Sequence, residues 1–355
     1  MLSTESRKYF HNAIAMSGVI GNYWAMSEHN DHLDIAHKIA GDLDEPKNSY
    51  EDLLAFLKSA PADKISEYSK ILLPNAVAVI QFTPVVERRD AIQPFLVESP
   101  EKVYETQNFD FDVLFTTTSV EFAGMISAVP PLKDINNDFN LQLPFRGLQL
   151  AIGSDNYRNL TAEIFKFYFG DNEQTERSLK QYITLLTHLN FQYEIDKVVQ
   201  KHAIKSKSKT FYAWFSVDSK LNVQKPRDPS VADIHGASHA DDLFYLFKSN
   251  SIQSLYDEVV SNQNDEHSKI SLQAIDNITK IFTNFAKYGE ISHKGDPISE
   301  LKPVKNGDVH FLNIKNDGLE AGPRPNKEAF DFLASIEEKT RKLSDDLLKQ
   351  KRDEL

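Results

Sequence analysis

The sequence contains no cysteine, which excludes disulfides, thiolate metal sites and cysteine nucleophiles. Positive charge is also scarce: 40 lysines and arginines stand against 52 aspartates and glutamates, a net charge of −12. An acidic chain of this kind does not offer the concentrated basic surface that binds nucleic acid, so we expect no nucleic-acid partner. With 13 glycines and 15 prolines in 355 residues, neither a fibrous repeat nor a disordered chain is indicated.

Long hydrophobic runs are missing as well. The most apolar window, Ile71–Val86, contains two prolines and is shorter than the roughly 20 residues that a membrane-spanning helix needs. We therefore expect no membrane span. The N-terminal stretch MLSTESRKYFHNAIAMSG has no continuous apolar core followed by a small-residue cleavage site, so it does not resemble a signal peptide.

The C-terminus resembles an address for the endoplasmic reticulum, although the N-terminus does not resemble a signal peptide. It is a close variant of the KDEL address that a receptor reads in the lumen of the endoplasmic reticulum, and it consists of Arg352, Asp353, Glu354 and Leu355. Without a signal peptide a chain does not enter that lumen, so either the tetrapeptide is accidental or residues are missing in front of Met1; we favour the second. The expected location is the endoplasmic reticulum lumen for an intact precursor, with the retention receptor as partner, and the cytoplasm for this chain expressed alone.

The apolar pattern predicts an α/β protein with few strands and many helices. Strands are expected at 76–82, 111–118, 211–217 and 310–314, the first two apolar enough for a covered, parallel-type sheet. Helices are expected at 27–40, 50–60, 160–170, 175–189 and 272–289, and in one long helix from Asn326 onward. We expect one domain over residues 1–336 and a charged helical tail over residues 337–355.

The stretch HGASHADD, residues 235–242, raises the question of a metal site or a nucleophile. His235 and His239 are four residues apart, but the zinc motif HExxH needs glutamate where Gly236 stands. We therefore expect no metal, and no glycine-rich loop suggests another cofactor. Ser238 lies in GASHA, which lacks the last glycine of the nucleophile motif G-x-S-x-G, and no other serine of the chain lies in that motif.

Glu121 and His239 are the candidate catalytic residues. Glu121 directly follows the predicted strand 111–118, and His239 lies in a loop after the predicted strand 211–217. Functional groups in open α/β sheets collect at the carboxyl ends of strands, and Glu before His matches the order Ser…Asp/Glu…His of α/β-hydrolases. Any α/β protein offers such loops, so these features alone leave the kind of site open.

Several segments together resemble the type-B carboxylesterase/cholinesterase family of α/β-hydrolases. The segment HGASHADDLFYLF has the residues typical of arthropod esterases. The segments run in family order from residue 2 to about residue 335. The segments are LSTESRKYFHNAIAMSG, VIQFTPVVERR, TTTSVEFAGM, HGASHADDLFYLF, IFTNFAKYGE and KPVKNGDVHFLNI. They are similar to the family's LSPLSKGLFHRAIxQSG, PxxPVVD, GxxSxEGL, GxxHxDELxYLF and WTNFAKTGNP segments and to its strand near the C-terminus.

The resemblance implies an α/β-hydrolase fold, present here as the C-terminal part of the mixed sheet with large helical insertions and without the first strands. It also implies a serine carboxylesterase that hydrolyses small-molecule carboxylic esters through an acyl-enzyme. In that mechanism His239 is the general base of the triad, and Glu121 accepts a hydrogen bond from its other ring nitrogen.

Departures from the family pattern limit what is expected of this chain. The family's nucleophile elbow and oxyanion-hole segment lie upstream of Met1, so we expect the chain to be inactive alone. Phe122 replaces the glycine after the triad glutamate, and Thr187-His188 replaces the family's SD. A missing front would also hold the signal peptide, and the glycosylation triplets at Asn159 and Asn277 agree with a secretory route.

Two other interpretations compete with the esterase. One is a non-catalytic, cholinesterase-like binding or adhesion protein, since the family includes members that lost the triad. The other is a truncated product without a stable fold, because a sheet without its first strands exposes an edge and part of its core. The presence of both Glu121 and His239 favours the esterase, because a binding protein has no need of the pair.

Overall fold

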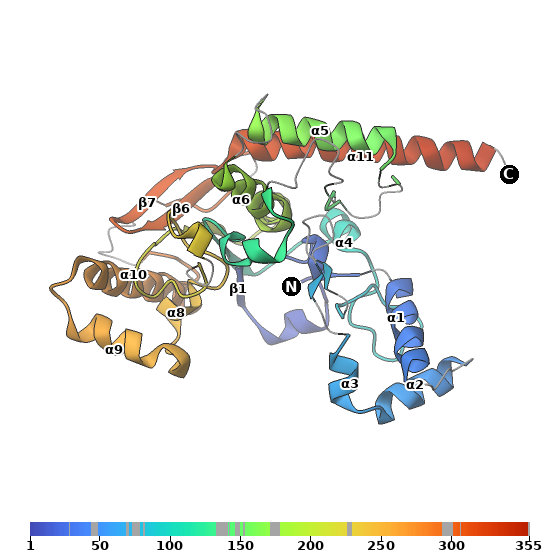
Figure 1. The fold of residues 1–355 in the computed structure, drawn as a ribbon, viewed down its shortest axis with the longest axis horizontal. Helices are drawn as coiled ribbons and strands as arrows, with labels where there is room; N and C mark the ends of the chain where they lie inside the picture. The colour runs from blue at the N-terminus through green and yellow to red at the C-terminus, as the bar shows by residue number, and fades with distance from the viewer. Residues whose placement is uncertain are drawn as a thin grey trace.

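A computed structural model describes residues 1–27, 29–43, 49–68, 71–72, 79–80, 82–132, 141, 143–145, 150–151, 153–170, 178–225, 229–292, 301–305 and 307–353. Its centre is a five-stranded sheet with the order β1-β4-β5-β6-β7 (Figure 1). The strands are β1 (Asn12–Met16), β4 (Asp112–Thr118), β5 (Thr210–Phe215), β6 (His310–Lys315) and β7 (Gly318–Pro323). The first four run parallel and β7 returns antiparallel to β6, which gives the expected mixed sheet.

Strands β4 and β5 are the buried centre of this sheet and confirm the predictions at 111–118 and 211–217. Successive side chains point to opposite faces, so each strand supplies two separate cores. Phe115 and Tyr212 belong to one core, whereas Leu114 and Phe211 belong to the other. A strand covered on both faces is apolar along nearly its whole length, which is why these two could be recognised from sequence.

One face of the sheet is covered by α7 (Tyr193–Lys205), which contacts both β4 and β5. Helices α4 (Pro100–Thr106) and α6 (Leu179–Thr187) extend this layer. Farther out, α5 (Asp155–Phe169) and the long α11 (Lys327–Asp353) lie side by side (Figure 1). The rings of Phe167 and Phe332 stack between them at a centroid distance of 4.2 Å.

The other face is covered by α10 (Glu266–Tyr288), with α8 (Leu243–Leu246) and α9 (Gln253–Ser261) packed against it. The side chain of Asp265 accepts a hydrogen bond from Ser268 N and caps the first turn of α10. The helix ends at Gly289, which adopts a left-handed conformation with φ +64°. The predicted helix 272–289 is therefore confirmed, with two more turns at its start.

Helix α11 is fixed to the body by ionic contacts. The Arg324 guanidinium, just before the helix, donates three hydrogen bonds to the buried carboxylate of Asp196 in α7. Tyr193 Oη donates to Glu337 at 2.6 Å. The helix continues unbroken through residue 336, so the division into a domain at 1–336 and a tail at 337–355 stays a prediction.

A smaller lobe precedes β4. It contains α1 (His29–Asp42), α2 (Tyr50–Ser59), α3 (Ala62–Ser66) and a separate antiparallel pair, β2 (Ile71–Leu72) with β3 (Val79–Ile80). The prediction that 76–82 joins a parallel sheet is wrong for its described part, because β3 pairs only within this small sheet. Pro74 and Pro84 flank the run, and proline removes a ladder donor, which fits a short pair better than a central strand.

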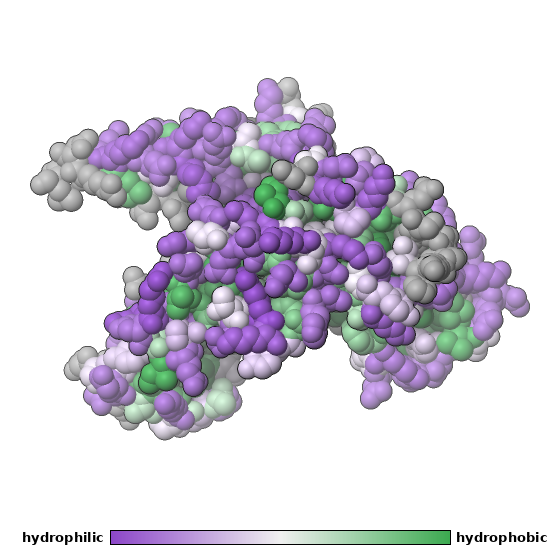
Figure 2. Space-filling model, turned by 180° about the vertical axis from the view of Figure 1, so that it is seen from behind, coloured by the Kyte–Doolittle hydropathy of each residue, from purple (hydrophilic) through white to green (hydrophobic). Residues whose placement is uncertain are grey.

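None of the described helices is both long and apolar enough to cross a bilayer. Hydrophilic side chains cover most of the back of the molecule, including much of the C-terminal helix (Figure 2).

Short 3₁₀ helices connect the main elements at Ser6–Tyr9, Tyr23–Ala25, Ala123–Ala128, Pro229–Val231 and Asn250–Ile252.

Candidate active site

The candidate site lies beyond the carboxyl ends of the parallel strands β4 and β5. Glu121 sits in the turn that follows β4, and His239 sits in the irregular loop between β5 and α8. Main-chain hydrogen bonds join the turn to the loop: Val120 N donates to Ala237 O, and His239 N donates to Glu121 O, both at 3.0 Å. Residues 118 positions apart in sequence are thus held next to each other by their own backbones.

The side chains of Glu121 and His239 are in direct contact. His239 Nδ1 lies 2.8 Å from Glu121 Oε2, and the second oxygen, Oε1, accepts from Thr117 Oγ1 and from Thr118 N, both at 2.7 Å. Glu121 is completely buried, whereas 41% of the His239 side chain is exposed. Because a carboxylate accepts, Nδ1 carries the proton, and this leaves the Nε2 lone pair as the basic position of the ring.

Glu121 and His239 shift each other's pKa. Burial alone would raise the pKa of Glu121, but the hydrogen bond and charge of His239 outweigh it and hold this pKa below its ordinary value. Burial likewise opposes protonation of His239, yet the Glu121 carboxylate raises the pKa of the imidazole above its ordinary value. The carboxylate is therefore ready to stabilise an imidazolium that forms at His239.

Two buried carboxyl groups follow the histidine. Burial raises the pKa of Asp241 to about 6 and that of Asp242 to about 7, and the charge of Glu121 adds to the effect on Asp242. Both aspartates also raise the pKa of His239. Asp241 accepts from Ser238 N and Gln224 N, both at 2.8 Å, so it organises the loop around the histidine.

A single turn of π-helix, His188–Gln192, lies between α6 and α7 and contacts the site. The Phe191 ring lies against the His239 ring at a centroid distance of 5.0 Å, and Gln192 Nε2 donates to Thr118 O at 2.8 Å. The sequence predicted a plain helix over 175–189, because a π-turn has no distinct apolar period. Such turns often mark functional sites.

Ser17 is a second residue that the sequence did not single out for this site. It directly follows β1, it is buried, and its φ of +48° is unusual for a residue other than glycine. Its side chain contributes to holding the pKa of Glu121 low, after the larger effect of His239. Among the described residues the Ser17 hydroxyl makes no hydrogen bond of ordinary geometry, so its effect on Glu121 is that of a nearby dipole.

The other features of HGASHADD have structural roles. The hydroxyl of Ser238 is fully buried, accepts from Gly124 N at 2.8 Å and donates to Glu121 O at 3.2 Å. His235 is 93% exposed and contacts Asp218. Within the described ranges, no three metal-binding side chains come together.

Gly236 is needed for the approach of the loop to the Glu121 turn. Its φ is +118°, and a Cβ atom there would lie 2.3 Å from Ser119 Oγ. We expect Gly236→Ala to lower the free energy of unfolding by roughly 3 to 5 kcal/mol, from backbone strain and overpacking together. Gly170→Ala is the control, because Gly170 also has positive φ but no atom of the described residues beyond its chain neighbours lies within 4 Å of its Cβ position. Equal losses in denaturant unfolding of the two variants would contradict this account.

The predicted modification and address residues lie elsewhere. Asn159 is exposed on α5, and Asn277 is half-buried in α10, where Thr279 Oγ1 donates to Ile275 O. Arg352 and Asp353 end α11, whereas Glu354 and Leu355 lie outside the described residues. Glycosylation and retention stay predictions.

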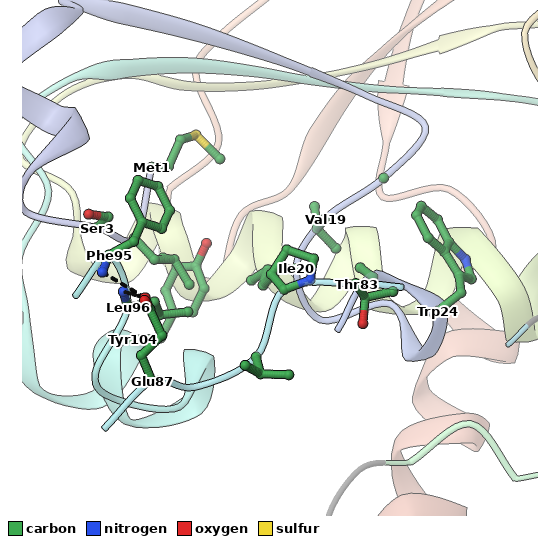
Figure 3. Close-up of a pocket in the computed structure, with 15 residues that line it drawn as sticks. Met1, Ser3, Val19, Ile20, Trp24, Thr83, Glu87, Phe95, Leu96 and Tyr104 are labelled. Carbon is green, nitrogen blue, oxygen red and sulfur yellow. Dashed lines mark hydrogen bonds between the residues drawn. The ribbon is translucent and has the colours of Figure 1, made fainter. Parts of the chain in front are cut away.

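A largely apolar cavity of about 680 Å³ opens near the site. The first residues of the chain, the segment after β1 and the segment 83–96 form its wall (Figure 3). Trp24 lines this cavity and packs against Phe191 at a centroid distance of 5.7 Å. Phe191 in turn contacts His239, so Trp24 and Phe191 connect the cavity wall to the imidazole.

A mixed, mostly parallel sheet covered on both faces, with a carboxylate and a histidine in contact beyond its strand ends, is an arrangement that α/β-hydrolases have. Comparison with known proteins gives the family. Residues 1–333 match the carboxylesterase family, and the chain belongs to it.

Two curated relatives are insect esterases. The chain is 21% identical to esterase B1 of Culex pipiens over 344 residues, which cover 94% of this chain and 61% of that protein. It is 24% identical to juvenile hormone esterase of Tribolium castaneum over 345 residues, which cover 88% of this chain and 56% of that protein. The chain thus spans about three fifths of the length of these relatives.

Proposed function

We propose that this chain carries the acid–base half of a serine carboxylesterase, with His239 as general base and Glu121 as its orienting carboxylate. The observation that carries the proposal is the 2.8 Å contact between His239 Nδ1 and a fully buried Glu121. The family supports ester hydrolysis in general. The exposed side of the imidazole is available to a serine hydroxyl, which is what a triad needs.

The proposed steps follow from the geometry of the pair. Nε2 of His239 takes the proton of the attacking serine, and the serine oxygen bonds to the ester carbonyl carbon. The resulting imidazolium is stabilised by Glu121 through Nδ1, and it returns the proton to the leaving alcohol. Water then attacks the acyl-enzyme by the same route, with His239 again as base, and releases the carboxylic acid.

The apolar cavity beside Trp24 supports a substrate with an apolar part. Its wall includes Val19, Leu96 and Tyr104 (Figure 3), and Trp24 of the same wall packs against Phe191, which contacts His239. Transfer of an apolar group into such a site is favourable by about 25 cal/mol per Å² of surface removed from water. We therefore propose carboxylic esters with an apolar group on one side of the ester bond as the substrate class.

The chain alone is proposed to be inactive, because no serine in it lies in G-x-S-x-G. We expect no hydrolysis of a p-nitrophenyl ester above the buffer rate and no labelling by a fluorophosphonate. The control is the same chain extended by any upstream coding sequence that carries G-x-S-x-G, which is expected to do both. Stoichiometric labelling of a serine within residues 1–355 would show that the nucleophile is in this chain after all.

The binding-protein alternative has less support. Its basis is that the family includes members that lost the triad, and this chain departs from the family pattern at Phe122 and at Thr187-His188. Phe122 is buried, and its N–H donates to Thr187 Oγ1 at 3.2 Å, so the substitutions are accommodated beside an intact Glu121–His239 contact. A protein that only binds gains nothing from a buried carboxylate, which is costly unless it is paired.

We also propose retention of the intact precursor in the endoplasmic reticulum through its terminal RDEL. Retention receptors read the free C-terminal tetrapeptide. Appending a single alanine after Leu355 is expected to move a precursor with a signal peptide into the medium. Unchanged retention would show that the tetrapeptide is not read.

A further inference from the structure

A buried lysine joins the loop that carries His239 to the segment that follows β5. Lys225 Nζ donates to the carbonyl oxygens of Ile234 at 2.7 Å and Gly236 at 3.0 Å, and to Asp218 Oδ1 at 2.7 Å. Only 5% of the Lys225 side chain is exposed. An ammonium group has three donors, and here each has its own partner, which is the condition under which a lysine is buried.

Two aspartates complete this cross-link. Asp218, the counter-ion of Lys225, also accepts from Gly236 N at 3.2 Å through its second oxygen. Asp241 ties the segments in the other direction, because it accepts from both Gln224 N and Ser238 N. The segment 218–225 and the histidine loop 234–242 are therefore connected on both sides of Gly236 by charged groups.

The opposite side of the loop is bound to the turn that contains Glu121. Ala237 N donates to Ser119 Oγ at 3.2 Å, and His239 N donates to Glu121 O at 3.0 Å. The stretch 234–240 contains no helix or strand to hold its shape. Main-chain hydrogen bonds and Ser119 hold it to the turn. On the side of the segment 218–225, its position depends on the side chains of Lys225, Asp218 and Asp241.

We propose that Lys225, with Asp218 as its counter-ion, is a positioning residue that fixes the histidine loop so that His239 Nδ1 stays against Glu121. It acts through the carbonyl groups of Ile234 and Gly236, not through contact with a substrate. Its meaning for catalysis rests on the proposed esterase function, whereas the positioning itself can be measured on this chain without any ester.

If Lys225 acted only as a remote charge, its removal would change the pKa of His239 in the opposite direction from loss of positioning. A cation near an imidazole disfavours the imidazolium, so removing the charge alone raises the pKa of His239. Loosening the loop weakens the hydrogen bond to Glu121, which lowers the pKa of His239. The sign of the change therefore distinguishes a positioning residue from a distant charge.

The test is an NMR titration of the histidines of this chain in Lys225→Met and in the double variant Asp218→Asn/Lys225→Met. We expect the pKa of His239 to fall by about 0.5 to 1 unit in both. The downfield imidazole proton that reports the Nδ1–Oε2 hydrogen bond is expected to weaken or disappear. Lys225→Arg, which keeps the charge and several donors, should restore part of both signals.

The double variant carries the test if Lys225→Met alone fails to fold, because it leaves no unpaired carboxylate at position 218. Lys220→Met is the matched control. Lys220 lies in the same segment but pairs with Glu258 on α9 and with Asp265, which precedes α10. This variant should not change the pKa of His239. An unchanged or raised His239 pKa in the folded double variant overturns the proposal. Loss of esterase activity in the upstream-extended protein for another reason leaves these NMR results unaffected, so the two failures are distinguishable.

Discussion

Replacement of His239 by alanine is expected to remove nearly all ester hydrolysis from the protein extended by an upstream segment with G-x-S-x-G. Without the imidazole, nothing takes the serine proton, and loss of a triad base costs roughly five to six orders of magnitude in kcat. The measurement is the initial rate with a p-nitrophenyl ester at saturating concentration. KM should change little, because the base does not contribute much to binding of the substrate ground state.

His235→Ala is the matched control for this variant. His235 lies four positions earlier in the same loop, is 93% exposed and contacts only Asp218 among the described hydrogen bonds. We expect it to keep the wild-type rate within a factor of about two, since surface substitutions usually change stability by no more than about 0.5 kcal/mol. A His239→Ala variant that keeps more than a tenth of the activity would show that the base is another residue.

Glu121→Gln is expected to lower kcat by about four orders of magnitude in the same extended protein, as loss of a triad carboxylate does in serine proteases. The amide no longer stabilises an imidazolium, and its NH₂ group can hold His239 in the wrong tautomer. A base acts in its neutral form, so we expect the activity of the extended protein to rise with pH through the raised pKa of His239. Without the carboxylate this pKa falls, and the inflection of the rate profile moves to lower pH.

The same pair makes a pH-dependent contribution to stability. The folded pKa of Glu121 lies below its unfolded value, so its contribution is present above about pH 4.5 and is lost as pH falls through the folded pKa. The folded pKa of His239 lies above its unfolded value, so its contribution is present below about pH 6.5 and is lost as pH rises through the folded pKa.

The control for Glu121→Gln is Glu105→Gln, an exposed change on α4. A rate profile for Glu121→Gln with the wild-type inflection would contradict the assignment of Glu121.

The elements found from sequence are those whose burial shows as a pattern. Strands β4 and β5 are covered on both faces and read as apolar runs, and α10 has an apolar face and a terminal Gly289. Strand β1 was not found, because Asn12–Met16 is short and only half-buried beside β4. Strand β7 contains two glycines and a proline, and it forms because β6 offers a partner, not because of its own propensity.

Some residues of the site could be predicted from the sequence and others could not. Glu121 and His239 could be found because each follows a recognisable strand inside a family motif. Ser17, Phe191 and Lys225 could not, because their roles depend on contacts that form only in the folded chain and on an unusual backbone in two cases. Positive φ at Ser17 and the π-turn at Phe191 arise from tertiary packing, and no local pattern predicts them.

The central claim is that Glu121 and His239 form a coupled acid–base pair, and it can be tested on this chain directly. The measurement is the pKa of His239 by NMR in the wild type and in Glu121→Gln, with the exposed His235 as internal reference. The account predicts a His239 pKa above the ordinary histidine value of about 6.5 in the wild type and a fall of at least about one unit in the variant. A His239 pKa that is the same in both proteins would contradict it.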